Sequence, residues 1–161
     1  MAEIIRPMER ADVSRVHEIE CACFRSPWSK LALAGELRND VAHYLVMVVD
    51  GVIAGYGGMW LLFEEAHVTN VAIMPDYRGS GRGRRLMLAM MRHAVKRGAE
   101  KMTLEVRESN TVAQRLYAGL DFEQNGFRPG YYSDTGEGAK LLWNNDIQKT
   151  LDRENETHET V

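Results

Sequence analysis

The feature that most constrains the fold is a glycine-rich turn at residues 78–84, where three glycines alternate with a serine and arginines. An amphipathic helix pattern begins directly after this turn, with an apolar stripe formed by Met87, Met90, Met91, Ala94 and Val95. Glycine lets backbone N–H groups approach an anion closely, and a helix N-terminus offers unpaired N–H groups and the positive end of the helix dipole. The pattern therefore predicts a phosphate-binding turn in the middle of the chain.

Three kinds of phosphate-binding turn have to be distinguished. A P-loop requires Gly-x4-Gly-Lys-Ser/Thr, and no Lys-Ser or Lys-Thr pair follows these glycines. A dinucleotide-binding turn requires Gly-x-Gly-x-x-Gly at the opening of a βαβ unit, whereas this turn has the spacing Gly-x-Gly-x-Gly and follows a run of predicted strands. The pattern that remains is Arg/Gln-x-x-Gly-x-Gly/Ala.

Length and composition are those of a globular protein, with 27% charged and 45% hydrophobic residues. We expect one domain over residues 1–149, followed by a polar, disordered tail at 150–161. No apolar run approaches the roughly 18 residues needed to cross a bilayer, and the N-terminus does not have the pattern of a signal peptide. Cys21 and Cys23 lie two apart on a predicted helix and pair poorly, so we expect buried, reduced thiols. These features predict a cytoplasmic protein that binds no membrane.

The net charge of −3 is unevenly distributed along the chain. Residues 78–107 contain nine Lys/Arg and two Glu, a local balance of +7, so the rest of the chain carries −10. A basic segment can bind nucleic acid. Here, however, the positive residues gather around the glycine turn and one helix, without the interleaved aromatic residues that stack on bases. We therefore expect a small polyanionic ligand and no direct binding of nucleic acid.

Periodicity, cap residues and turn residues predict the element order β-α-α-β-β-β-α-β-α-β-β, a mixed sheet with helices on both sides. After the first strand, strands are expected at 44–49, 52–62, 66–74, 102–106, about 123–132 and about 139–145. Predicted helix N-caps are Asp12, Ser29 and either Ser109 or Asn110. Three glycines make the second strand of the 44–62 hairpin unusual: Gly55, Gly57 and Gly58. They indicate a bulge, a close backbone approach or a loose strand.

The turn resembles the pyrophosphate loop of the GCN5-related N-acetyltransferase (GNAT) superfamily, and the resemblance covers residues 3–145. Four further signatures resemble its RimI-type branch, which acetylates the N-terminal alanine of a small-subunit ribosomal protein: Ser26-Pro27-Trp28-Ser29, Asn70-Val71-Ala72-Ile73, Leu104-Glu105-Val106-Arg107-Glu108-Ser109-Asn110 and Tyr131-Tyr132. The resemblance implies an α/β fold with a mixed, mostly antiparallel sheet and helices on both faces. It also implies two splayed parallel strands that hold acetyl-CoA as the cosubstrate.

In this family, backbone groups of the strand before the turn hold the acetyl and pantetheine portions of acetyl-CoA, much as a peptide adds to a sheet edge. The resemblance therefore assigns cofactor binding to Val71, Ala72, Ile73, Arg78, Gly79, Ser80, Gly81, Arg82, Gly83, Arg84 and Asn110. Taken alone, the strand residues would be an ordinary buried strand, and Asn110 would be a helix cap. The two cysteines and five histidines have no metal-ligand spacing, so we expect no metal.

Glu105 and Tyr117 are the expected catalytic residues. Glu105 interrupts an apolar strand on the face opposite Leu104, and burial moves a carboxyl group towards the range useful for a general base. The alternatives are an exposed strand glutamate or a partner of Arg107. The resemblance implies that the Tyr117 hydroxyl protonates the leaving thiolate of CoA, although its place on a helix stripe would otherwise indicate a core aromatic residue.

Trp28, Tyr131 and Tyr132 are expected to line the groove for the acceptor, because aromatic residues with polar tips suit a short extended protein N-terminus. Each residue would serve equally well in core or hairpin packing. Two other functions remain open: acetylation of a small amine such as a polyamine or aminoglycoside, and a non-catalytic acyl-CoA-binding regulator. We expect a monomer or weak homodimer. The chain departs from its relatives at Asp121-Phe122, where many have Gly-Phe, and at residues 128–130.

Overall fold

The computed structural model describes residues 2–159 and contains twelve main elements. They are β1 (Glu3–Pro7), α1 (Val13–Cys23), α2 (Lys30–Glu36), β2 (Ala42–Val49), β3 (Val52–Leu62), β4 (Glu65–Ile73), α3 (Arg82–Val95), β5 (Lys101–Arg107), α4 (Thr111–Ala118), β6 (Glu123–Arg128), β7 (Ala139–Asn144) and α5 (Ile147–Glu159). The predicted element order is confirmed up to β7. Among the described residues, no helix has the length and apolar character needed to span a membrane.

The strands are hydrogen-bonded in the order β1-β2-β3-β4-β5-β7-β6. The pairs β1–β2, β2–β3, β5–β7 and β6–β7 are antiparallel, whereas β4 and β5 are parallel. The prediction of a mixed, mostly antiparallel sheet is therefore confirmed. The described chain forms two compact units. Unit 1 contains the residues up to Leu61 together with Val68–Met90, and unit 2 contains Leu62–His67 together with the residues from Met91 onward.

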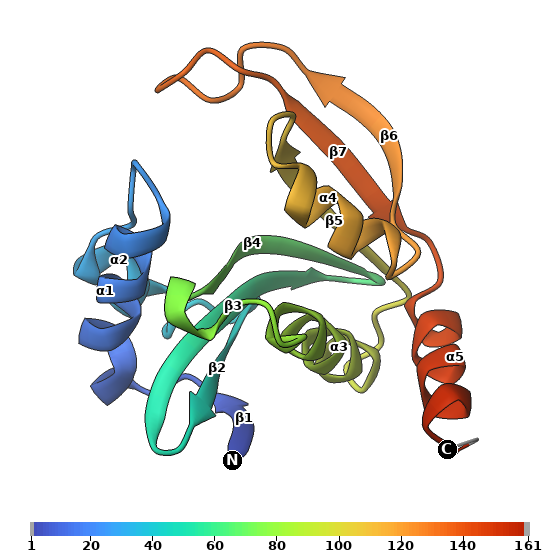
Figure 1. Cartoon of the computed structure of the whole chain (residues 1–161), viewed down its shortest axis with the longest axis horizontal. Coiled ribbons are helices and arrows are strands. Elements are labelled where there is room, and N and C mark those ends of the chain that lie inside the picture. The colour runs from blue at the N-terminus through green and yellow to red at the C-terminus, as the bar shows by residue number, and fades with distance from the viewer. Residues whose placement is uncertain (1, 160–161) are drawn as a thin grey trace. The chain divides into compact units, whose positions relative to one another are not determined.

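In unit 1, α1 and α2 pack against each other (Figure 1). Their inward faces join strand residues in one buried apolar cluster that includes Val16, Ile19, Leu33, Val46 and Tyr56. The Ser29 hydroxyl accepts a hydrogen bond from the Ala32 N–H at 3.1 Å, so the predicted cap of α2 is confirmed.

Asp12 does not cap α1 with its side chain, which corrects the prediction for that residue. Its carboxylate instead accepts hydrogen bonds from the Arg6 guanidinium at 2.7 and 2.9 Å and from the Glu9 N–H at 2.7 Å. The ion pair with Arg6 of β1 thus takes the place of the predicted hydrogen bond between the Asp12 side chain and the first turn of α1. The two cysteines are free, but Cys21 is exposed and Cys23 is half-buried, so the expectation of two buried thiols was wrong.

β3 contains a bulge directly before Gly55 and a close backbone approach at Gly55 itself. The pairing with β2 passes from Met47–Gly55 to Val48–Ile53, which leaves one extra residue in β3. A Cβ atom at Gly55 would lie 2.5 Å from the Ile73 Cδ1 atom and 2.7 Å from the Ala72 carbonyl oxygen. Glycine is therefore required where β3 passes the end of β4.

A buried polar contact joins α1 to β3. Glu20, which is 1% exposed, accepts hydrogen bonds from the Tyr56 hydroxyl and from the backbone N–H of Trp28, the latter at 2.9 Å.

Tyr56→Phe would remove one of the donors that compensate the buried carboxylate. We expect it to lower the free energy of unfolding by about 1–3 kcal/mol. Urea denaturation measures this change, and Tyr77→Phe is the control because Tyr77 is only half-buried. Equal unfolding free energies for Tyr56→Phe and the parent would contradict the expectation.

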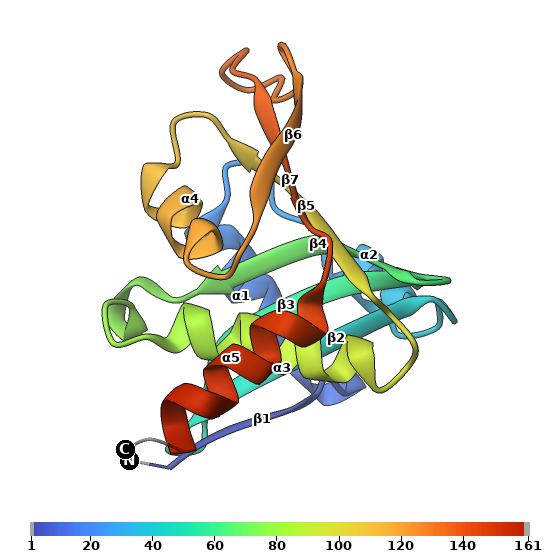
Figure 2. The ribbon, with the colours of Figure 1, turned by 90° about the vertical axis from the view of Figure 1, so that its right-hand side faces the viewer.

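In unit 2, β5, β7 and β6 run side by side, with α4 next to them (Figure 2). The Asn110 side-chain oxygen accepts a hydrogen bond from the Ala113 N–H at 3.2 Å, which confirms Asn110 as the cap of α4. Gly98 has φ +94°, the left-handed conformation that a glycine after a helix favours.

The prediction of a disordered tail from residue 150 is wrong as far as Glu159, because α5 extends through this segment. Ile147, Thr150 and Leu151 are buried along one side of the helix. The Thr150 hydroxyl also donates a hydrogen bond to Asp121 at 2.8 Å. Three inward-facing residues thus fix a helix whose overall composition is polar. Residues 160 and 161 of the predicted tail lie outside the described residues.

Candidate functional site

The glycine turn lies in unit 1 and leads directly into α3. The helix begins at Arg82, so residues 82–84 form its first turn instead of preceding it as predicted. Gly79 and Gly81 have φ +87° and +80°, a conformation that glycine adopts without steric cost. The first N–H groups of a helix have no acceptor within the helix. The turn therefore offers the backbone donors that an anion requires.

Arginine side chains hold the turn in shape. Arg82 donates to the Tyr77 carbonyl at 3.1 Å and to the Ser80 hydroxyl at 2.7 Å, and Arg85 donates to the Ser80 carbonyl at 2.9 Å. Arg85 also forms two short hydrogen bonds to Glu3, at 2.6 and 2.8 Å, and these lower the pKa of Glu3. The sequence prediction omitted Arg85 and Glu3. The basic run extended to Arg85, but nothing in the pattern indicated a partner 82 residues earlier.

The predicted pantetheine strand ends beside the turn. Ala72 and Ile73 are buried, and Val71 is half-buried. The Ile73 carbonyl accepts a hydrogen bond from the Arg78 Nε at 2.8 Å, which ties the end of β4 to the start of the turn. The parallel pairing of β4 with β5 joins residues 65–67 to residues 101–103, and Val71 to Ile73 lie further along β4.

Trp28 is half-buried and packs against the apolar cluster of unit 1. Its backbone N–H donates to Glu20, and its backbone carbonyl lies 2.9 Å from the His17 Nδ1. Trp28 therefore contributes to core packing, which was the alternative to a place in the acceptor groove.

Unit 2 brings together Glu105, Tyr131 and Tyr132 with two arginines. The Glu105 side chain is 30% exposed, and its Oε1 lies 3.7 Å from the Arg128 Nε. The interaction with the nearby Glu105 carboxylate raises the pKa of Tyr131. Glu105 is therefore neither the buried, unpaired acid that the strand pattern suggested nor the partner of Arg107.

The two tyrosines of the β6–β7 loop form an edge-to-face pair with ring centroids 5.1 Å apart. Tyr131 is 46% exposed, while Tyr132 is half-buried beneath the Arg107 guanidinium, whose carbon lies 4.0 Å from the ring centroid. Burial raises the pKa of Tyr132 to about 12. One ring is thus available to an acceptor, and the other supports it.

Tyr117 lies on α4 and is buried, with its ring edge-on to Phe122 at a centroid distance of 5.7 Å. Burial raises the pKa of Tyr117 to about 12, so its hydroxyl stays protonated at neutral pH and can donate a proton or hydrogen bond. The Asn110 oxygen is occupied by the helix cap, whereas its amide group keeps donor capacity.

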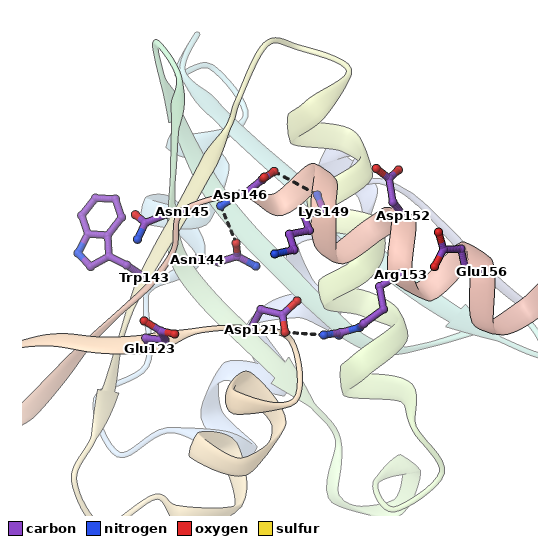
Figure 3. A pocket seen from close by; sticks show the side chains of 10 residues that line it. All are labelled: Asp121, Glu123, Trp143, Asn144, Asn145, Asp146, Lys149, Asp152, Arg153 and Glu156. Atoms are coloured by element: carbon purple, nitrogen blue, oxygen red, sulfur yellow. Dashed lines mark hydrogen bonds and ion pairs between the residues drawn. The ribbon is translucent and has the colours of Figure 1, made fainter.

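An open pocket of about 630 Å³ lies elsewhere in unit 2, and none of the predicted site residues line it (Figure 3). Asp121, one of its lining residues, has φ +67°, a left-handed conformation that non-glycine residues rarely adopt. It points toward Arg153, with which it forms an ion pair, and this contact and the Thr150 hydroxyl hold the conformation (Figure 3). Within residues 2–159, no group of histidine, cysteine or acidic side chains could hold a metal ion.

Comparisons with known proteins agree with these features. The model of the acetyltransferase (GNAT) family matches residues 13–122. A Bacillus subtilis (strain 168) protein, provisionally named as a ribosomal protein bS18-alanine N-acetyltransferase, is 41% identical over 86% of this chain and 93% of its own length. The ribosomal protein bS18-alanine N-acetyltransferase of Haemophilus ducreyi is 36% identical over 80% of this chain and 88% of its own.

Among solved structures, the chain is similar to the crystal structure of the ribosomal-protein-S18-alanine N-acetyltransferase from Escherichia coli. The TM-score is 0.82 at 29% identity, and the match covers 88% of this chain and 92% of the other.

Proposed function

Because the chain belongs to the acetyltransferase (GNAT) family, we propose that it transfers the acetyl group of acetyl-CoA to a protein N-terminal α-amine, specifically the N-terminal alanine of ribosomal protein bS18. The observation that carries this proposal is the cluster of Glu105, Tyr131 and Tyr132 in unit 2, which joins an ionisable base to an exposed aromatic side chain. A ribosomal acceptor would place the reaction in the cytoplasm, as the sequence predicts.

Unit 1 supplies the groups suited to acetyl-CoA. Backbone groups of Val71, Ala72 and Ile73 would bind the acetyl and pantetheine portions as an added strand. The N–H groups of residues 79–84, in two left-handed glycines and the first turn of α3, would bind the pyrophosphate. The Asn110 amide would add a donor to the cosubstrate. The first N–H groups of α3 suit pyrophosphate binding because they have no acceptor within the helix.

The proposed reaction is direct transfer in a ternary complex. Glu105 accepts a proton from the acceptor ammonium, directly or through a water molecule, and the neutral nitrogen then attacks the thioester carbonyl carbon. The tetrahedral intermediate collapses as the carbon–sulfur bond breaks, and the Tyr117 hydroxyl protonates the departing thiolate. The nitrogen loses its second proton to solvent as the amide forms, and the Tyr117 phenolate regains a proton from solvent. A weak base is sufficient to deprotonate the acceptor, because an N-terminal amine ordinarily has a pKa of about 7.7–8.0. No covalent enzyme intermediate is required.

The close approach of Gly55 to β4 gives a prediction for cofactor binding. A methyl group at this position would force the Ala72 carbonyl and the Ile73 side chain to move. We expect Gly55→Ala to raise the KM for acetyl-CoA by roughly 10-fold, equivalent to about 1.4 kcal/mol of binding free energy. Gly35→Ala is the matched control, because a Cβ at Gly35 meets no atom within 4 Å. An unchanged KM for acetyl-CoA in Gly55→Ala would contradict the placement of the cosubstrate beside Ala72 and Ile73.

The proposed acceptor is tested by comparing rates with a panel of amines under saturating acetyl-CoA. The panel contains a short peptide with a free N-terminal alanine, the same peptide with a blocked N-terminus, a polyamine and an aminoglycoside. We expect the free peptide to have the highest kcat/KM. A higher value for a small amine would favour small-molecule acetylation. Tight binding of acetyl-CoA with no acetylated product in any assay would favour a non-catalytic regulator.

A further inference from the structure

Glu105 and Arg107 project from the same face of β5, because residues two apart on a strand point the same way. We propose that Arg107 is a positioning residue that fixes the β6–β7 loop, residues 129–138, and with it Tyr131 and Tyr132, beside Glu105. This inference rests on the proposed function, since it concerns how the acceptor site keeps its shape. It assigns a role to a residue for which the sequence offered only a pairing with Glu105.

The contacts of Arg107 reach two acidic side chains of this loop at once. Its Nη1 and Nη2 donate to the two carboxylate oxygens of Asp134 at 3.0 and 2.8 Å, and its Nη1 also lies 3.4 Å from Glu137. The same guanidinium lies over the ring of Tyr132. A planar fork that pairs with a carboxylate and stacks on an aromatic ring is specific to arginine, because lysine provides only a point charge.

Ser109, two residues further along the chain, holds the loop at a second point. Its hydroxyl donates to Glu137 at 2.6 Å and its N–H donates to the same oxygen at 3.2 Å. The Ser109 hydrogen bond lowers the pKa of Glu137, which keeps that carboxylate ionised for Arg107. Within the loop, the Tyr132 N–H donates to the Glu137 carbonyl at 3.1 Å. The loop is therefore held from β5 and from the segment that follows it.

These contacts give each polar residue of the Leu-Glu-Val-Arg-x-Ser-Asn string a role around the proposed acceptor site, apart from Glu108. Glu105 is the proposed base, Arg107 and Ser109 hold the tyrosine loop, and Asn110 caps α4, the helix that carries Tyr117. The exposed Tyr131 ring and the base thus belong to one network, because Arg128 pairs with Glu105 and lies 5.7 Å from the centroid of the Tyr131 ring, while the neighbouring Tyr132 lies under Arg107. Loss of Arg107 would release the acceptor side while leaving the cofactor turn of unit 1 unchanged.

The test is steady-state kinetics of Arg107→Gln with an N-terminal-alanine peptide. We expect the KM for the peptide to rise about 10-fold or more, because the substitution removes hydrogen bonds between charged groups. The kcat and the KM for acetyl-CoA should change less than about 3-fold. Arg107→Lys should recover part of the peptide affinity. Arg153→Gln is the matched control, because it removes an arginine–aspartate ion pair of the same unit outside the predicted site.

Hydrogen exchange of residues 129–138 gives a second measurement that does not depend on activity. We expect faster exchange of this loop in Arg107→Gln than in the parent, with α4 unchanged. A parent that acetylates the peptide and an Arg107→Gln variant with an unchanged peptide KM would overturn the inference, as would an equal rise in Arg153→Gln. If the parent is inactive, the proposed function fails. In that case unchanged exchange of the loop would independently overturn the role of Arg107.

Discussion

Replacing Tyr117 with phenylalanine is expected to lower kcat by roughly 100-fold or more, the usual contribution of a positioned general acid. The substitution removes only the hydroxyl, so the edge-to-face contact with Phe122 and the packing of α4 are retained. The KM for acetyl-CoA should change little, because backbone groups of unit 1 are proposed to bind the cosubstrate. Steady-state kinetics with both substrates varied separates the two effects.

The pH profile provides a second check on Tyr117. Burial holds its pKa at about 12, so the proton needed by the leaving thiolate is present throughout the neutral range. We expect no loss of kcat through tyrosine ionisation below about pH 10, the ordinary pKa of a tyrosine. Tyr132→Phe is the matched control, because Tyr132 has a similarly raised pKa and no proposed role in proton transfer. A Tyr117→Phe variant with a kcat within threefold of the parent would exclude Tyr117 as the acid.

Replacing Glu105 with glutamine is expected to lower kcat/KM for the peptide by roughly 10- to 100-fold at pH 7, at the low end for a general base because the pKa of the α-amine, about 7.7–8.0, lies close to neutral and its proton is lost readily. The loss should shrink as the pH approaches 9. Above its pKa of about 8 the α-amine is already neutral and needs no base. Measuring kcat/KM across this pH range distinguishes a lost base from a lost structural contact.

Arg128→Gln is the companion variant for Glu105. It retains the carboxylate and removes the ion pair between the two side chains, together with the contact of Arg128 with the Tyr131 ring. We expect a smaller loss of kcat/KM than in Glu105→Gln, without the recovery at high pH. Equal losses in the two variants at every pH would instead assign Glu105 to a structural ion pair.

Much of the fold could be predicted because its local signals are strong. The caps at Ser29 and Asn110, the left-handed Gly98 and the glycine turn each follow from the chemistry of one or two residues. The departures arise where a distant partner overrides a local preference. The Asp12 side chain pairs with Arg6 and does not cap α1. The helix α5 is stabilised by the burial of three of its side chains.

The candidate site shows the same division. Alternation along β5 correctly separated Glu105 from its buried neighbours, but the surroundings of its carboxylate depend on which residues the end of β6 and the β6–β7 loop carry. Arg128, the last residue of β6, is the residue that pairs with Glu105. A pairing of this kind depends on strand register and loop conformation, which single-residue patterns do not encode. The same holds for Glu3 and Arg85, which are 82 residues apart.

The most direct test of the central claim is to locate the acetyl group by tandem mass spectrometry after incubating the protein with acetyl-CoA and one peptide. The peptide has a free N-terminal alanine and one internal lysine, so both kinds of amine compete within the same molecule. We expect the acetyl group on the N-terminal nitrogen, with the lysine unmodified. Acetylation of the lysine alone, or no acetylated peptide at all, would contradict the account.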